Sequence, residues 1–158
     1  MRHLATMLCT TGDAREFEVG ENLEASSRVQ AVVDYYGPTD FLEMDAHRPP
    51  GGMVHDAADS PESELVGGAI QENRAKVARA NPITYVTSDA PPFLICHGDQ
   101  DPLVPHHQSE LLDAALRKAK VPVIFYTVKG AGHGGFTDPK VSELTREFLA
   151  RHLHPSLH

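Results

Sequence analysis

The chain has 158 residues, of which 41% are hydrophobic and 23% are charged, and its formal net charge is −8 at pH 7. This length and composition are typical of one soluble domain with a hydrophobic core of its own. The acidic charge argues against nucleic acid or an anionic membrane as a main partner, and no apolar run approaches the ~20 residues of a membrane-spanning helix.

The first half of the chain is predicted to contain a helix, a strand and an irregular segment. Apolar residues share one face of residues 2–9, which predicts a short helix. The β-branched and aromatic run "VQAVVDYYG" predicts a buried strand from Val29 to Tyr35. Residues 43–73 are rich in proline, glycine and charge, and we expect them to form an irregular, lid-like insertion within a single domain of residues 1–158.

Short helices are predicted after this strand, and the rest of the chain alternates between strands and helices. Within the insertion, Ser60, Pro61 and Gly67 are suited to cap, begin and end a helix. Apolar strands are expected over residues 92–97 and 121–128, and amphipathic helices follow each of them. Strands that are apolar on both faces and alternate with helices predict an α/β fold with a parallel three-stranded sheet.

Polar residues and glycines follow two of the predicted strands. Asp99 and Asp101 come directly after the strand over 92–97, and His133 follows the next strand, between glycines, in "KGAGHGGF". Because parallel strands end at the same edge of a sheet, a carboxylate there can orient the imidazole of His133 as a catalytic base. An Asp in such a turn can instead bond to its own backbone, and we favour that role for Asp99.

Several segments, taken together and in order, resemble a known family over nearly the whole chain. The segments "VVDYYGPTDF", "ANPITYVTSDAPPFLICHGDQDPLVP" and "VKGAGHGGF" resemble the C-terminal part of bacterial α/β-hydrolase carboxylesterases. The resemblance is to the acetylesterase and hormone-sensitive-lipase-like type, which is related to prolyl-oligopeptidase-like hydrolases. It implies a Ser-His-Asp triad that cleaves short-chain esters without a metal or other cofactor, in which Asp101 matches the acid and His133 the base. By analogy, Tyr36 and Phe41 line an acyl pocket, although packing in the core is an equal alternative.

The nucleophile of that family is not found in the sequence. No serine of the chain lies in the Gly-x-Ser-x-Gly pattern that carries it. The segment "RHLATML" resembles the helix that follows this serine, so we expect the serine, the oxyanion loop and the early strands to lie before Met1. Cys9 and Cys96 are expected to be buried free thiols rather than replacement nucleophiles. If Met1 is the true start, a soluble cytoplasmic protein is expected.

A half-sheet would leave the edge of its first strand bare, which leads to further expectations. An apolar edge is an association site, so we expect a homodimer or higher oligomer besides a small ester substrate. The alternative function is a silent hydrolase remnant that acts as a dimerising binding or assembly module, and a third is an active dimer with a rebuilt nucleophile. Neighbouring His106 and His107 are expected to be exposed to solvent rather than to bind a metal.

Overall fold

The computed structural model describes residues 2–12 and 14–153. At its centre is a parallel sheet of three strands in the order β1-β2-β3, namely β1 (Val32–Tyr35), β2 (Phe93–Gly98) and β3 (Val123–Val128). The chain crosses from each strand to the next through helical connections, as parallel pairing requires. The predicted α/β fold with a three-stranded parallel sheet is therefore confirmed.

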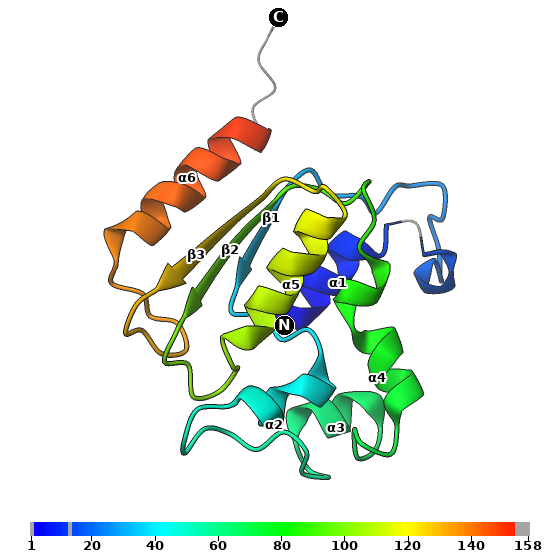
Figure 1. The fold of residues 1–158 in the computed structure, drawn as a ribbon. Coiled ribbons are helices and arrows are strands. Elements are labelled where there is room, and N and C mark those ends of the chain that lie inside the picture. Colours follow the sequence, from blue (N-terminus) through cyan, green and yellow to red (C-terminus); the bar gives the residue numbers. More distant parts are fainter. Residues whose placement is uncertain (1, 13, 154–158) are drawn as a thin grey trace, which may run out of the picture.

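Helices cover both faces of this sheet, as Figure 1 shows. The two helices α1 (Arg2–Thr10) and α5 (His107–Lys118) lie on one face, and α6 (Pro139–Leu153) lies on the other. In the described part of the chain, no helix is long and apolar enough to cross a membrane. Side chains of β2 alternate between two core clusters. The first contains Val32, Phe93, Ile95, Leu112, Leu116 and Val121, and the second contains Leu94, Cys96, Val128, Val141 and Phe148.

Prolines determine where the strands begin. β1 starts at Val32 rather than at the predicted Val29, because the preceding positions face Pro91 and Pro92 in the register of the sheet. A proline has no N–H to donate to a neighbouring strand, so the ladder cannot extend there. β3 likewise starts at Val123, two residues later than expected and directly after a proline.

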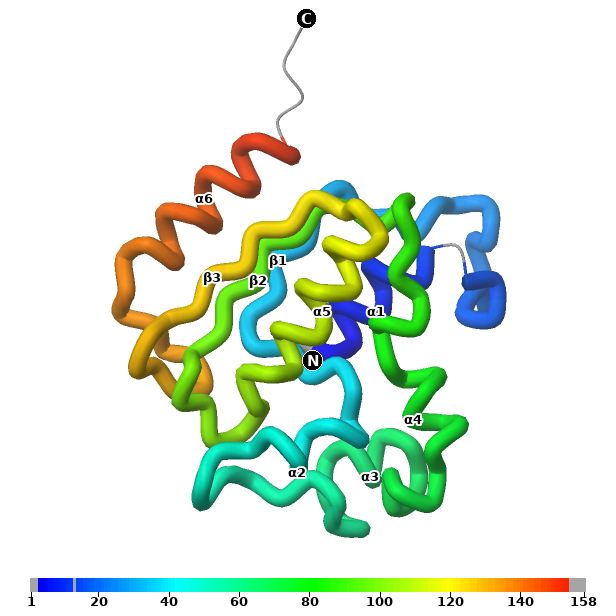
Figure 2. The backbone as a smooth tube through the Cα atoms, viewed as in Figure 1, coloured from blue at the N-terminus to red at the C-terminus, as the bar shows by residue number. Residues whose placement is uncertain are grey.

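The connection between β1 and β2, residues 36–92, lies largely at the carboxyl ends of the strands. Figure 1 and Figure 2 show α2 and α3 grouped below the sheet, with α4 beside them. We call residues 36–92 the cover. It contains the predicted irregular segment 43–73, in which two short helices are separated by loops. Its elements are η2 (Phe41–Glu43), α2 (Met44–His47), α3 (Pro61–Val66), α4 (Arg74–Ala80) and η3 (Pro82–Tyr85), and η1 (Arg15–Phe17) precedes β1.

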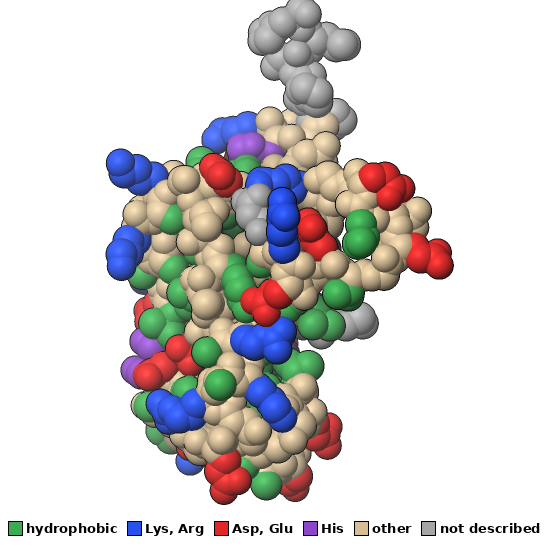
Figure 3. All heavy atoms as spheres, turned by 90° about the vertical axis from the view of Figure 1, so that its right-hand side faces the viewer, with side chains coloured by type: hydrophobic (Ala, Val, Ile, Leu, Met, Phe, Trp, Pro, Cys, Tyr) green, Lys and Arg blue, Asp and Glu red, His purple; other side chains and the backbone are tan. Residues whose placement is uncertain are grey.

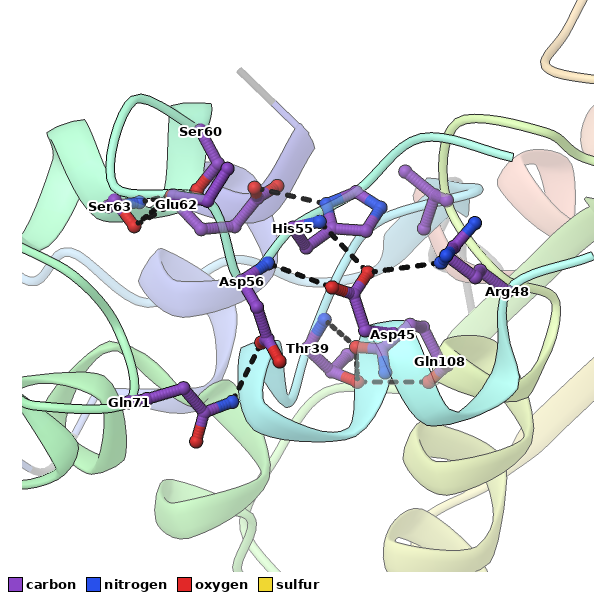
Figure 4. Close-up of polar contacts among 12 residues, drawn as sticks. Thr39, Asp45, Arg48, His55, Asp56, Ser60, Glu62, Ser63, Gln71 and Gln108 are labelled. Carbon is purple, nitrogen blue, oxygen red and sulfur yellow. Dashed lines mark hydrogen bonds and ion pairs between the residues drawn. The ribbon is translucent and has the colours of Figure 1, made fainter. Parts of the chain in front are cut away.

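Polar contacts fix the cover, and those between Thr39 and Gln108 join it to α5 (Figure 4). Asp45 accepts a hydrogen bond from the backbone N–H of His55 over 2.8 Å. The ring Nδ1 of His55 lies 3.0 Å from Oε2 of Glu62, and both residues are buried. Thr39 donates its backbone N–H to Oε1 of Gln108 in α5 over 2.8 Å, inside the protein. The cover is thus held against the α5 side of the sheet.

Helix α3 begins and ends as its sequence predicts. Oγ of Ser60 accepts the backbone N–H of Ser63 over 3.1 Å, and Pro61 is the first helical residue. Gly67 ends the helix with a φ of 75°, in the left-handed region that favours glycine.

Replacing Ser60 by Ala is expected to lower the free energy of unfolding by about 1 kcal/mol, because the first turn loses its cap. The measurement is urea unfolding followed by circular dichroism. Ser88, an exposed serine in a turn, provides the control, and Ser88→Ala should change stability by less than about 0.5 kcal/mol. Equal effects of the two substitutions would show that the cap contributes nothing.

Candidate active site

Asp101 lies in the turn that follows β2, and its carboxylate accepts four hydrogen bonds. Oδ1 accepts the backbone N–H groups of Leu103 and Val104 over 2.8 and 2.9 Å. Oδ2 lies 3.1 Å from Nε2 of His97 and 2.7 Å from Nδ1 of His133. Because a carboxylate has about four acceptor positions, this set fills them and fixes the orientation of the group.

The ionisation of Asp101 follows from these bonds. Burial alone would raise the pKa of this carboxyl group. The hydrogen bonds from His97, from the backbone of Val104 and Leu103 and from His133 outweigh burial, and they lower the pKa below its ordinary value of 3.8. Asp101 is therefore a carboxylate at neutral pH and can only accept hydrogen bonds from its neighbours.

This ionisation determines the tautomer of His133. Nδ1 must carry the hydrogen that it donates to Asp101, so a neutral imidazole presents a lone pair at Nε2. Within the described residues Nε2 has no hydrogen-bond partner, and the side chain is 25% exposed. A buried acid, an oriented imidazole and an open basic nitrogen are the arrangement of a general base.

Two glycines explain how the loop of His133 approaches the end of β2. A Cβ at Gly98 would collide with the carbonyl oxygens of Ala131 and Gly132. Gly134 has a φ of 78°, and a Cβ there would collide with the hydroxyl of Tyr36. The missing side chains thus let backbone and rings pack closely around the imidazole.

The two predicted substrate contacts lie in different places. Tyr36 follows β1, has a φ of 50° and packs its ring against that of His133, with centroids 4.3 Å apart. Phe41 is 2% exposed and lies in the core cluster of the cover, next to Met44 and Val104. A substrate role stays a prediction for both residues, and the structure shows only that the ring of Tyr36 contacts that of His133.

The remaining polar residues near the strand ends differ from their predicted roles. Asp99 accepts the backbone N–H of Gly130 over 2.7 Å, so it joins the ends of β2 and β3 instead of capping its own turn. The expectation that His106 and His107 are exposed is wrong, because both are half-buried against neighbouring rings. His106 stacks on Phe125, and the ring of His107 lies 3.5 Å from that of His47.

His97 was not predicted as part of the site. Its ring is fully buried and contacts Asp101, the carbonyl of Val104 and the hydroxyl of Ser109. In the sequence it resembles one more core residue at the end of an apolar strand. The available sign was its position four residues before the acid, across a tight turn.

Comparison with known proteins relates this geometry to a family. The model of the family described as BD-FAE matches residues 2–116. The chain belongs to the BD-FAE family. Probable carboxylic ester hydrolase LipM of Mycobacterium tuberculosis is 34% identical over 125 residues, which cover 78% of this chain and 27% of LipM. Esterase LipQ of the same organism is 31% identical over 134 residues, which cover 85% of this chain and 30% of LipQ.

A solved structure agrees with this assignment. A truncated form of a carbohydrate esterase from gut microbiota superimposes with a TM-score of 0.81 at 30% identity, and the match covers 97% of this chain and 57% of that one. The resemblance to α/β-hydrolase carboxylesterases is thus confirmed, and the family is one of carboxylic ester hydrolases. The chain spans about a third of the length of these curated relatives and over half of the length of the carbohydrate esterase.

Neither cysteine of the BD-FAE chain has the properties of a nucleophile. Burial raises the pKa of the Cys9 thiol to about 11 and that of the Cys96 thiol to about 12, and the negative charge of Asp34 adds to both effects. Both cysteines are free and pack in the core clusters. Within the described residues, no three His, Cys, Asp or Glu side chains are grouped to hold a metal ion.

The two thiols are expected to react slowly with iodoacetamide at pH 8, because the thiolate is the reactive form and both groups stay protonated. The measurement is intact mass over time, and the same chain in urea is the control. Unfolding returns the thiols to an ordinary pKa and should make both react quickly. Rapid single modification of the folded chain would identify a reactive cysteine and contradict this expectation.

Proposed function

We propose that this chain provides the acid and the base of a serine esterase that cleaves short-chain carboxylic esters. Asp101 orients the base, and His133 is the base. One observation carries the proposal: Oδ2 of Asp101 lies 2.7 Å from Nδ1 of His133, while Nε2 has no partner in the described part of the chain. The named esterases among its relatives support the same chemistry.

In this mechanism, Nε2 of His133 takes the proton of a serine hydroxyl as its oxygen attacks the ester carbonyl. The resulting imidazolium is stabilised by the carboxylate of Asp101, which itself stays ionised. His133 then gives the proton to the departing alcohol, and an acyl-serine remains. Water, activated by the same nitrogen, releases the acid and restores the serine.

The serine in this proposal comes from outside the 158 residues. No serine of the sequence lies in a Gly-x-Ser-x-Gly turn, and no hydroxyl of the described residues bonds to Nε2. The greater length of the relatives is consistent with such a source. The acyl group of the substrate is proposed to rest near Tyr36, beside the base; a contact with Phe41 stays a prediction.

The test compares two proteins: the 158-residue chain, and the product of the reading frame extended upstream of the Met1 codon. We expect the longer product to hydrolyse p-nitrophenyl acetate and to take up one fluorophosphonate on a serine, while the short chain takes up none. His133→Ala should lower the rate by roughly 10⁴-fold. Unchanged hydrolysis in this variant would contradict the proposal. An adduct on the short chain would instead favour a rebuilt nucleophile.

We also propose an assembly module as a second candidate function, because a specific surface favours it. Among the described strands, β1 has a partner on one side only. Figure 3 shows hydrophobic side chains on the neighbouring face, where α1, α3 and α4 border a groove of about 470 Å³. Leu4, Leu8 and Leu65 line this groove and are 58%, 49% and 52% exposed. A second copy of the chain would cover such an apolar surface.

Light scattering at micromolar concentration tests this second candidate. We expect a dimer or larger oligomer for the wild type and a monomer for Leu8→Glu. Val54, which is 48% exposed and lies in the cover, provides the control, and Val54→Glu should leave the mass unchanged. A monodisperse wild-type monomer would contradict association through this surface.

A further inference from the structure

The bonds of His97 determine its hydrogen positions. Nε2 lies 3.0 Å from the carbonyl oxygen of Val104, an atom that can only accept. Nε2 therefore carries a hydrogen, which it shares between this carbonyl and Oδ2 of Asp101. Nδ1 lies 2.7 Å from Oγ of Ser109, so in the neutral ring it accepts the serine hydroxyl. Both ring nitrogens are thus engaged, and the ring cannot turn without losing bonds.

The two oxygens of Asp101 are held by donors of different kinds. Oδ1 is bound by backbone N–H groups, which a turn of this shape supplies whatever its side chains are. Besides the base itself, His97 is the donor on Oδ2. The terminal torsion of an Asp side chain has a broad energy minimum, so rotamer preference alone does not set the plane of the carboxylate.

We propose that His97, held by Ser109, is a positioning residue that keeps Oδ2 of Asp101 directed at Nδ1 of His133. This rests on the proposed function, since it treats Asp101 and His133 as the acid and base of the esterase. His97 does not reach the open side of the base, because its ring is completely buried. It acts through the acid, and its loss would loosen the bond between Asp101 and His133 while leaving the backbone donors in place.

The neighbours of His97 make it suited to this role. Its ring lies 5.4 Å from that of His106 and 6.2 Å from that of Tyr36, centroid to centroid. The ring is thus packed on several sides, besides its bonds to Ser109 and Asp101. Such a supporting contact maintains the geometry that a general base needs.

The experiment observes the hydrogen bond directly, by NMR of the full 158-residue chain labelled with ¹⁵N-histidine. The His133 Nδ1–H resonance is assigned by its loss in His133→Ala. We expect His97→Leu to remove this resonance or to broaden it through exchange with water. His97→Gln should retain it, because the Gln amide can donate to Oδ2 in place of Nε2. Ser109→Ala, which preserves the ring, should broaden it partially.

A second buried histidine provides the matched control. His55 is 1% exposed and also contacts a carboxylate, that of Glu62, but in the cover. His55→Leu should leave the His133 resonance unchanged. If His55→Leu removed the resonance as fully as His97→Leu does, general destabilisation would explain both losses and the proposal would fall. An unchanged resonance in folded His97→Leu would overturn the proposal. If His97→Leu does not fold, an unchanged resonance in Ser109→Ala would overturn it.

This readout is independent of catalysis. If the esterase assay fails while the resonance depends on His97, the positioning role stands and the proposed function falls. If hydrolysis depends on His133 while the His133 resonance is unchanged in His97→Leu, the proposed function stands and the positioning role falls.

Discussion

Asp101→Asn is expected to lower the free energy of unfolding by about 3 to 5 kcal/mol, because two buried N–H groups lose their acceptor and each such loss costs about 1–3 kcal/mol. An Asn side chain has one acceptor oxygen, whereas four N–H groups converge on this carboxylate. Whichever way the amide turns, its NH₂ faces two other donors. Urea unfolding followed by circular dichroism measures the loss, and the esterase rate of the longer product should fall by roughly 10⁴-fold.

Asp99 provides the control for this substitution. It is exposed, and its bond to the backbone N–H of Gly130 can be kept by an amide oxygen. Asp99→Asn should therefore change stability by less than about 0.5 kcal/mol. Similar losses of stability in the two variants would mean that the four hydrogen bonds to Asp101 do not stabilise the fold.

The pH dependence of the same pair of proteins follows from linkage. The pKa of Asp101 is lower in the folded chain than its ordinary value of 3.8, so its contribution to stability is present above that value. The contribution is lost as the pH falls through the folded pKa. The stability difference between wild type and Asp101→Asn should therefore be largest at neutral pH and shrink in acid. A difference that grows on acidification would contradict the assigned ionisation.

Gly98→Ala is expected to cost about 3 kcal/mol, at the upper end for an added methyl group, because the atoms it meets belong to the backbone. The carbonyl groups of Ala131 and Gly132 cannot rotate away as a side chain would. The loop must lift from the end of β2, which would carry His133 away from Asp101. Unfolding curves and the His133 Nδ1–H resonance measure these two effects.

Gly130, in the same loop, provides the control that distinguishes steric crowding from backbone strain. It has a φ of 72°, and a Cβ at this position would meet no atom within 4 Å beyond its chain neighbours. Gly130→Ala therefore carries only the cost of a left-handed residue, about 1–2 kcal/mol. The His133 resonance should be retained in this variant. If Gly98→Ala were milder than Gly130→Ala, the close approach at β2 would not constrain the site.

The sequence was sufficient for the architecture because its strands and helices carry unambiguous patterns. Continuous apolar runs indicated the parallel strands. Leu112 and Leu116 of the helix over 107–118 are buried, as the periodicity of that helix predicts. The first residue of each strand was less predictable. It depends on whether the facing position holds a proline, and that requires the register between strands.

The contact between Asp101 and His133 could be predicted from the sequence, whereas the residues that support it could not. Asp101 and His133 follow strand ends that any parallel sheet brings together. The contribution of His97 depends on the exact path of a four-residue turn, and the close approach at Gly98 involves residues more than thirty positions away. The left-handed backbone of Tyr36 has no sign in the sequence, since nothing in "DYYG" separates it from an ordinary strand residue.

The long cover between β1 and β2 has a consequence for how this protein can change over evolutionary time. Its ends are fixed at neighbouring strands, whereas Asp101 and His133 both belong to the chain after β2. Lengthening a flexible loop is inexpensive, since each doubling of its length costs only about 0.6 kcal/mol of closure entropy. Insertions in residues 43–73 can therefore remodel this end of the molecule (Figure 1) while Asp101 and His133 stay where they are. If the proposed esterase acquires new ester preferences, its descendants are expected to differ first in this segment.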